Sequence, residues 1–443
     1  MKKPINNYLK YLFSTIGSSL IVTFYSLVDA ICVGQYHGEE GTASLAVLTP
    51  FWTVIFSFGL LFGIGGSTLY KKYKSIGDSK EANSFFTLSL LLSSLVILII
   101  EALLIINFEN FFIFLGAKES NILVLCKRYG IFMLLGLPLF LLEQVFSCFI
   151  RNDERPLLAT ISVIGGGVTN IVLDILLVFT FDLGIFGAGL ATFLGQCLTF
   201  IVIITHFFSK KNSLKIVRIN SFFSKMKDVL IIGIPSFIVD ISVGVVLIVF
   251  NNQINIYASN ATTVLAICGV IANINMLFQS LSYAIGQSNQ PLLTEAYSLK
   301  DVKLVNTYNK YAICTSFVVG LIGFVVVMSI PNLIIDIFID TSLSVEIFDI
   351  GGKLIRLYFA LIPFSVFNIY ITYYFQSILK ATYSVIISLI RSLVLPLIFI
   401  MVLPLMSLDM MFLSVAFSEL ITLFISILFL YKTRKELISI DKI

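Results

Sequence analysis

The sequence contains few charged residues, and this absence excludes most soluble classes of protein. Only 12% of its 443 residues are charged, against about 25% in a typical soluble domain. By contrast, 58% are hydrophobic, which is more apolar surface than a soluble fold of this length can bury. The composition therefore excludes a disordered chain, a secreted disulfide scaffold and a nucleic-acid-binding protein. It predicts a polytopic helical membrane protein.

Histidine is also scarce, and the cysteines show no paired motif. The two histidines, His37 and His206, are far apart in the sequence, so we do not expect a histidine-based metal site. The six cysteines lie in or at the edge of apolar runs without a CxxC pair, which indicates small core residues. The sequence has no Walker motif, so ATP is not expected to drive this chain directly. It offers no plausible constellation for an intramembrane enzyme either, so we expect a non-enzymatic protein without a cofactor.

The apolar residues are gathered in long runs. A transmembrane helix needs about 20 of them, and twelve runs of suitable length are present. They lie at 10–34, 45–69, 84–107, 124–150, 157–181, 185–207, 228–250, 262–290, 309–330, 352–378, 382–404 and 410–431. We therefore predict an all-α polytopic fold of twelve transmembrane helices. The first run is interrupted by Ser and Thr and carries Asp29, so we expect a retained helix and not a signal peptide.

Lysine and arginine concentrate in alternate loops. Over the twelve predicted spans, 23 of these residues fall on the side that holds both termini and 5 on the other, while Arg391 lies inside a span. Because basic residues are retained on the cytoplasmic side, this bias predicts that both termini are cytoplasmic. The location that follows is the cell inner (cytoplasmic) membrane, as a multi-pass protein.

The longest charged linker falls halfway along the chain and separates two blocks of six spans. We predict an N-terminal six-helix bundle at 1–207, a cytoplasmic linker at 208–227 and a C-terminal six-helix bundle at 228–443. Three features recur between the halves at nearly one offset: Gly65 and Gly286, the D-x-K-x-x-N patterns that begin at Asp78 and Asp301, and Pro138 and Pro363. Parallel repeats of this kind commonly enclose a cavity that opens to each side in turn. A scaffold of duplicated helices without transport is the alternative.

Polar groups on spans 1, 5 and 6 fall at one depth. Asp29, Asn170, Asp174 and Thr192 lie roughly 8–15 Å inside the outer boundary, at 1.5 Å per helical residue. Two carboxylates, an amide and a hydroxyl form an all-oxygen set, which suits Na⁺, and a close carboxylate pair also holds a proton. The set is therefore a candidate cation site. The alternative is that each of these residues makes a separate hydrogen bond between helices.

The second half offers polar groups for a substrate. Asp240, near the centre of span 7, is a candidate contact for a cationic substrate. Asn273 and Gln279 on span 8 are candidates to line a wet cavity. Tyr370 on span 10 is a candidate for a cation–π contact with an organic cation. Packing roles are the alternative for each of them.

Two further charges lie within spans 11 and 12. Arg391 and Glu419 have opposite signs and are both flanked by apolar residues. An intramembrane charge is costly unless it is paired. We therefore expect a structural ion pair between these spans.

Several short motifs resemble a known family. They are Val28-Asp29 followed by Val33-Gly34, Arg151-Asn-Asp153-Glu-Arg-Pro156, Asn170-x-x-x-Asp174, and Gly184-Ile-Phe-Gly187-Ala188-Gly-Leu-Ala191-Thr192. Together with the twelve-span plan, they resemble the MATE family, the multidrug and toxic compound extrusion transporters. These form part of the multidrug/oligosaccharidyl-lipid/polysaccharide flippase superfamily. The resemblance covers nearly the whole chain in topology, and its motifs are concentrated in the first half.

The resemblance implies two pseudo-symmetric six-helix bundles and export of amphiphilic, often cationic, compounds by alternating access. An H⁺ or Na⁺ gradient would drive export, and the protein would function as a monomer among membrane lipids. The family's cation site carries over to Asp29, Asn170, Asp174 and Thr192. Some members use acids in spans 7 and 10 instead, but span 10 has no acid here, so the first-half site is favoured. A lipid-linked precursor flippase, a channel and a membrane scaffold are the alternatives.

Overall fold

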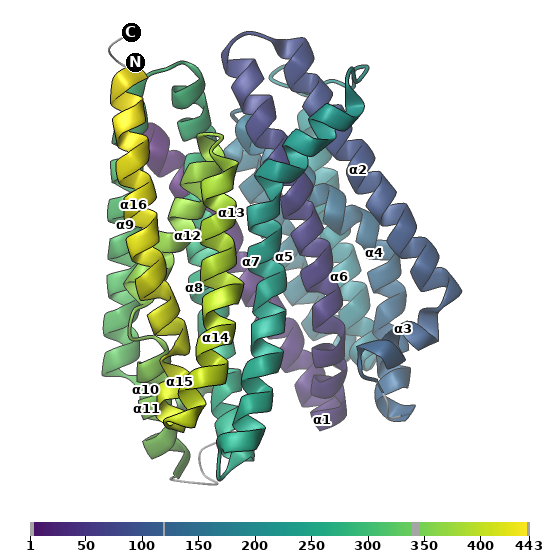
Figure 1. Ribbon diagram of the computed structural model, residues 1–443. Coiled ribbons are helices and arrows are strands. Elements are labelled where there is room, and N and C mark those ends of the chain that lie inside the picture. Colours follow the sequence, from purple (N-terminus) through teal and green to yellow (C-terminus); the bar gives the residue numbers. More distant parts are fainter. Residues whose placement is uncertain (1–3, 118–119, 339–345, 441–443) are drawn as a thin grey trace. The chain divides into compact units, whose positions relative to one another are not determined.

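Figure 1 shows the computed structural model, in which residues 4–117, 120–338 and 346–440 are described. Every regular element within these ranges is a helix. Twelve helical segments among them are long and apolar enough to cross a membrane. They are Pro4–Gly38, Glu40–Ser75, Ser79–Ile106, Ser120–Asn152, Pro156–Thr180, Gly184–Phe208, Phe222–Tyr257, Thr263–Ser298, Val302–Ser329, Ile350–Ser377, Ala381–Leu405 and Ser414–Leu437. The predicted fold class and number of spans are confirmed.

The chain forms two compact units. The first comprises residues 13–237, and the second comprises the residues up to Leu12 together with those from Ile238 onward. Six of the twelve segments therefore lie mainly in each unit. The helices that begin in the first half are α1 Pro4–Ser75, α2 Ser79–Ile106, α3 Phe108–Leu115, α4 Ser120–Asn152, α5 Pro156–Ile175, η1 Leu176–Thr180, α6 Gly184–Ile204 and η2 Thr205–Phe208.

The second half begins with α7 Phe222–Tyr257, whose first residues up to Phe237 belong to the first unit. The helices that follow are α8 Ala261–Ser298, α9 Val302–Ser329, α10 Pro331–Phe338, α11 Glu346–Tyr358, α12 Ile362–Ser377, α13 Ala381–Leu389, η4 Ile390–Val394, α14 Leu395–Val402, η5 Leu403–Leu405, α15 Leu408–Phe412 and α16 Ser414–Ile440. The η1 and η4 segments are π-helical turns that continue the helices before them.

The first two spans form one helix with a kink. The backbone of Gly38 has φ 61° and ψ −137°, a conformation that a side chain would strain. Glycine at this position therefore allows α1 to end its first span and begin its second without a loop.

The internal repeat is visible in the helix ends. Asp78 caps α2 by accepting from the backbone N–H of Glu81 at 3.0 Å, and Asp301 caps α9 by accepting from that of Leu304 at 2.9 Å. Both helices have 28 residues, and each is followed by a helix of eight. A short polar side chain at an N-cap satisfies a free N–H group at the start of a helix. The recurring D-x-K-x-x-N pattern is therefore a repeated helix start.

The charged linker follows the surface of the first unit. Extended residues between η2 and α7 donate backbone N–H groups to this unit: Lys215 to Asn83 Oδ1 at 2.7 Å and Val217 to Thr87 Oγ1 at 3.0 Å. Leu214 is buried beside them. These contacts place the linker with the first unit, while the domain boundaries at 207 and 228 stay a prediction.

Candidate cation site and buried charge clusters

Close packing of α5 on α6 positions two of the predicted site residues. A Cβ atom on Gly166 would lie 2.6 Å from the carbonyl oxygen of Gly195, and one on Gly195 would lie 2.8 Å from that of Gly166. Only glycine permits such an approach of two backbones. Asn170 lies one turn along α5 from Gly166, and Thr192 lies one turn before Gly195 on α6. The approach therefore brings their side chains together.

Hydrogen bonds join three of the four predicted residues, and Tyr129 of α4 lies between two of them. Asn170 Nδ2 donates to Thr192 Oγ1 at 3.3 Å. The Tyr129 hydroxyl lies 3.3 Å from Thr192 Oγ1 and donates to Asp29 Oδ2 at 3.4 Å. Asp174 lies close enough to Asp29 for their charges to interact. The structure thus brings the predicted set together. Sequence reasoning missed Tyr129, which is one of 18 tyrosines without a distinguishing pattern.

The site contains buried oxygens that lack donors. Asp29, Asn170 and Asp174 are at most 9% exposed. Four of their oxygens receive no hydrogen bond of normal geometry from the described part of the chain: Oδ1 of Asp29, Oδ1 of Asn170 and both carboxylate oxygens of Asp174. The Asn170 amide does approach Asp174. The Oε1 atom of Gln196, one turn after Thr192, is likewise buried and accepts no hydrogen bond from the described residues. Buried acceptors without partners cost free energy. A proton or a hard cation would satisfy these oxygens.

The ligand types separate this site from a transition-metal centre. In the described ranges, no group of three or more His, Cys, Asp or Glu side chains could hold a metal ion. The candidate set has two carboxylates, one amide and one hydroxyl, and hard cations favour such oxygen ligands. Its chemistry therefore fits Na⁺ or H⁺.

The outer end of α1 is tied to the turn that precedes α6. Ile185, in the first turn of α6, donates its backbone N–H to His37 Nε2 at 3.0 Å, and the Tyr36 hydroxyl donates to Asp182 Oδ1 at 2.5 Å. Gly184 has φ 53°, and a Cβ there would lie 2.5 Å from His37 Nε2. These contacts hold α1 against α5 and α6 next to the candidate site. The π-helical turn η1, of a kind frequent at functional sites, directly follows this part of α5.

In the second unit, Asp240 is grouped with one other predicted substrate residue. The Tyr283 hydroxyl donates to Asp240 Oδ1 at 2.6 Å, and Gln279 Nε2 donates to the same hydroxyl at 2.6 Å. Asp240 is 6% exposed, and its Oδ2 has no donor among the described residues. This carboxylate therefore remains able to accept a cationic or hydrogen-bonding group.

Asn273 and Tyr370 make their contacts elsewhere. Asn273 is exposed and donates to the backbone carbonyl of Gly269. Tyr370 is fully buried, donates to Asn309 Oδ1 at 2.7 Å and accepts from Asn289 Nδ2 at 3.2 Å. The structure therefore does not join them to Asp240, and the Tyr370 ring lies in a packed polar network of α8, α9 and α12.

The expected pairing of Arg391 and Glu419 is present. Arg391 Nε lies 2.9 Å from Glu419 Oε1, and the side chains are 11% and 5% exposed. Asn368 on α12 donates to Glu419 Oε2 at 2.8 Å. The guanidinium lies in the π-helical turn η4. Arg391 thus forms an ion pair with a buried carboxylate.

This ion pair predicts a matched set of stability changes. Arg391→Met leaves Glu419 buried and uncompensated, and should lower the free energy of unfolding by about 3–5 kcal/mol, whereas replacing both partners by apolar residues should restore most of the loss. Thermal unfolding of the purified single and double variants measures this. An Arg391→Met/Glu419→Met protein no more stable than Arg391→Met would refute the account of the pair.

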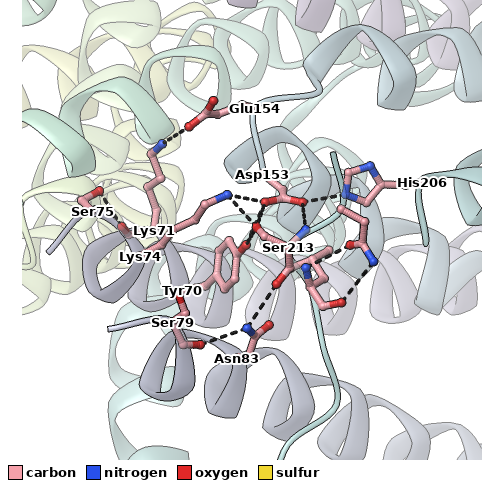
Figure 2. A network of polar contacts seen from close by, with 12 residues as sticks. Tyr70, Lys71, Lys74, Ser75, Ser79, Asn83, Asp153, Glu154, His206 and Ser213 are labelled. Carbon is pink, nitrogen blue, oxygen red and sulfur yellow. Dashed lines mark hydrogen bonds and ion pairs between the residues drawn. The ribbon is translucent and has the colours of Figure 1, made fainter. Parts of the chain in front are cut away.

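A second buried carboxylate, Asp153, organises the turn between α4 and α5, and sequence reasoning gave it no role. Figure 2 shows Tyr70, Lys74, His206 and Ser213 around it. His206 Nε2 lies 2.7 Å from its Oδ2, and the Tyr70 hydroxyl donates to Oδ1 at 2.9 Å. Lys74 Nζ and the Ser213 hydroxyl also donate to Oδ1, and the Ser213 backbone N–H donates to Oδ2 at 3.1 Å. The Asp153 cluster therefore joins α1, η2 and the linker.

These hydrogen bonds decide the ionisation of Asp153. Burial alone would raise the pKa of this carboxyl, but hydrogen bonds from His206, Lys74 and Ser213 outweigh it and hold the pKa well below its usual range. Asp153 is therefore a carboxylate acceptor. Because it lies between two spans, it fixes their ends to the linker.

The fold and these clusters define a twelve-span membrane protein of two repeated halves, with buried acids in each. A family model named MatE matches residues 15–176 and 235–402. The chain belongs to the MatE family.

Curated relatives match part of the chain. The multidrug export protein MepA of Staphylococcus saprophyticus is 25% identical over 196 residues, which are 44% of this chain and 43% of that protein. MepA of Staphylococcus aureus (strain MSSA476) is 23% identical over 198 residues, with the same shares. The match thus spans less than half the length of these relatives.

Solved structures match the whole fold. An outward-facing multidrug resistance MATE family transporter of the MOP superfamily has a TM-score of 0.89 at 20% identity, covering 100% of this chain and 97% of that one. A MOP superfamily transporter from Pyrococcus furiosus has a TM-score of 0.88 at 20% identity and the same coverage. The latter is described as having a binding pocket of reverse polarity that suggests a different function. The shared fold therefore does not determine the substrate.

Proposed function

We propose that this protein is a cation-coupled antiporter, and not an enzyme, that exports amphiphilic, often cationic, compounds by alternating access. The observation that carries the proposal is the set of donor-free oxygens on Asp29, Asn170 and Asp174, buried in the first unit of a MatE-family chain. Relatives described as multidrug export proteins support the substrate class. The coupling ion, H⁺ or Na⁺, is the second substrate, and no cofactor is required.

Ion binding at this site would change the balance between two arrangements of the helices. Asp29 is on α1, Asn170 and Asp174 are on α5, and Thr192 is on α6. Two neighbouring carboxylates in a low-dielectric bundle repel each other, and a bound proton or Na⁺ relieves that repulsion. Binding therefore favours the arrangement in which the three helices close around the ion. A ligand shifts such an equilibrium only by its differential affinity for the two states.

Asp240 is proposed as an electrostatic contact for the exported cation, with Gln279 close to it. Asp240→Asn keeps the volume and the bond to Tyr283 but removes the charge, so export of cations should fall by about fivefold or more while export of neutral compounds changes little. Parallel efflux assays with a cationic and a neutral dye measure the ratio. An equal loss for both dyes would assign Asp240 a structural role. Asn273 and Tyr370 stay sequence-based proposals, and their contacts do not add support.

The geometry favours this function over a lipid-linked precursor flippase. A flippase for anionic precursors needs free basic groups within the spans. Arg391 is instead paired with Glu419. We further propose that the protein acts as a monomer surrounded by lipid.

We propose that both termini and the linker are cytoplasmic, in the cell inner membrane. In a background without exposed cysteine, Glu40→Cys should react with a membrane-impermeant maleimide added to intact cells, and Arg218→Cys should react only after the cells are opened. Both positions are exposed, and the charge bias of the loops sets the direction. The opposite labelling pattern would reverse the topology.

A further inference from the structure

The linker between the sixth and seventh spans carries charge of one sign. Residues 208–227 contain six basic residues and no acid. Lys225 is buried and forms an ion pair with Glu81 of α2 at 2.8 Å. The other five are exposed and form no ion pair with any residue that the structure describes: Lys210, Lys211, Lys215, Arg218 and Lys227. This surface therefore suits an anionic partner.

The linker runs along the side of α2 within the first unit. Asn83 Nδ2 donates to the Ser213 carbonyl at 3.1 Å (Figure 2), and the Val217 N–H donates to Thr87 Oγ1 at 3.0 Å. Thr87 is eight residues after Ser79, the first residue of α2, or about 12 Å along the helix axis. The linker therefore lies beside the start of the apolar part of this span.

The face of α2 that the linker covers continues into an apolar stripe. Thr87 is followed on the same helical face by Leu91, Leu95 and Leu98, at steps of four, four and three residues. Thr87 is buried, whereas each of these leucines is more than half exposed. Exposed leucines on a membrane-spanning helix suit the hydrocarbon core of a bilayer. The linker therefore lies at one end of a lipid-facing stripe, at the edge of the bilayer.

Large apolar side chains project from the linker and its two ends. Phe208, Ile216 and Phe223 are 85%, 78% and 77% exposed. Phe208 ends the sixth span, and Phe223 lies in the first turn of α7. Segments that lie in the membrane interface combine Lys and Arg with such apolar side chains. Composition and position therefore both fit the headgroup region of the bilayer.

We propose that the linker is a binding surface for anionic lipid headgroups of the membrane that the protein spans. Lys215 and Arg218 contact lipid phosphates, and Ile216 between them inserts among the acyl chains. Each Lys or Arg near an anionic membrane surface strengthens binding by about fivefold. A nucleic acid or an acidic protein matches the charge but not a position beside lipid-facing leucines. The inference goes beyond export and does not depend on the ion site.

The test places a fluorescent label on the linker and nitroxide groups on lipids. The label is attached to Ile216→Cys in a background with Cys197→Ser and Cys314→Ser, because the other four cysteines are buried. The protein is reconstituted in phosphatidylcholine vesicles that contain phosphatidylglycerol as the minor lipid. One preparation carries the nitroxide on phosphatidylglycerol and the other carries it on phosphatidylcholine, at the same depth and concentration. The ratio of the two quenching efficiencies measures the enrichment of anionic lipid at the linker.

We expect phosphatidylglycerol to be enriched about fivefold or more at low salt. The enrichment should disappear at about 1 M salt, where the Debye length is only about 3 Å. Lys215→Gln/Arg218→Gln removes both phosphate contacts and keeps the backbone bonds to α2, so the ratio should fall below about two. Lys432→Gln/Lys435→Gln is the matched control, because it removes the same charge from exposed positions of α16 and should leave the ratio unchanged.

Three results would overturn the proposal. A label that neither lipid quenches would place Ile216 in water and leave the linker as a surface for a soluble polyanion. Equal quenching by both lipids at low salt would show that the linker lies in the membrane without selecting anionic headgroups. A ratio that survives Lys215→Gln/Arg218→Gln would assign the enrichment to another surface. None of these results bears on the ion site, which export by Asp29→Asn tests separately.

Discussion

Replacing Asp29 or Asp174 by Asn should abolish gradient-driven export while leaving the fold intact. Each amide fills the volume of the acid it replaces, so packing among α1, α5 and α6 is kept. The substitution removes a titratable carboxylate, and with it the free energy that couples ion binding to substrate export. Coupling free energies are typically about 1–3 kcal/mol, or about 5–150-fold, so the initial rate of dye export should fall at least about tenfold. Efflux from proteoliposomes with equal protein content measures the rate.

Glu101→Gln provides the matched control for these substitutions. Glu101 is also a carboxylate within a predicted span, on α2, but it is not part of the candidate site. Its replacement should leave export within about twofold of the starting protein, because a partly exposed acid near a span end reaches water. Substrate binding should survive in Asp29→Asn, since the ion site and Asp240 lie in different units. An Asp29→Asn protein that still concentrates dye against a gradient would contradict the assignment.

Asp153→Asn should strongly lower the free energy of unfolding. The carboxylate accepts hydrogen bonds from Lys74, His206 and Ser213, and removing one partner of a buried charged cluster costs about 3–5 kcal/mol. Lys74 would lose its ion pair, and the linker would lose its attachment at Ser213. Thermal unfolding should begin at a lower temperature, with earlier proteolysis in the linker.

The pH dependence of this loss follows from the lowered pKa of Asp153. The pKa of Asp153 is lower in the folded protein than in the unfolded chain, where it is about 3.9. Its carboxylate therefore contributes its full stabilisation above about pH 3.9, and this contribution is lost as the pH falls toward the folded-state pKa. The difference in unfolding free energy between the starting protein and Asp153→Asn should therefore shrink as the pH falls below about 4. Glu154→Gln is the neighbouring control. Glu154 is 67% exposed and pairs with Lys71 at 3.7 Å, so its loss should cost less than about 1 kcal/mol. Equal destabilisation by both substitutions would refute the role of Asp153.

The twelve spans follow from the sequence because hydropathy acts locally. A run of about 20 apolar residues has few alternatives to a membrane helix. The helix ends were less accurate, as at α7, predicted at 228–250 but found at Phe222–Tyr257. Its first turns carry polar and charged residues, among them Lys225, that extend beyond the apolar window while remaining helical.

The candidate site was predictable in its members but not in its contacts. Asp29 and Asp174 are conspicuous because acids are rare in apolar runs, and their depth follows from the helical rise. Tyr129 was not predictable, since its role depends on how α4 is rotated against α1. Asp153 belongs to a motif that the sequence analysis noted, but its contacts were not predictable, because its donors come from residues 70–74, 206 and 213 and meet only when the chain is folded.

Packing also decides where two predicted substrate residues point. Tyr370 was singled out for its aromatic ring, but its hydroxyl is enclosed by Asn289 and Asn309. Asn273 is directed to its own helix at Gly269. A helical pattern gives the face of a residue, whereas its partners depend on neighbouring helices that the pattern does not specify.

The most direct measurement is efflux of a cationic dye from proteoliposomes that contain the purified protein, with a proton gradient, a Na⁺ gradient or neither imposed. The account predicts that dye moves against its own gradient when one of the two ion gradients is present, that collapse of that gradient stops the movement, and that Asp29→Asn behaves like empty liposomes. Dye movement that is indifferent to both ion gradients, or that persists unchanged in Asp29→Asn, would contradict it.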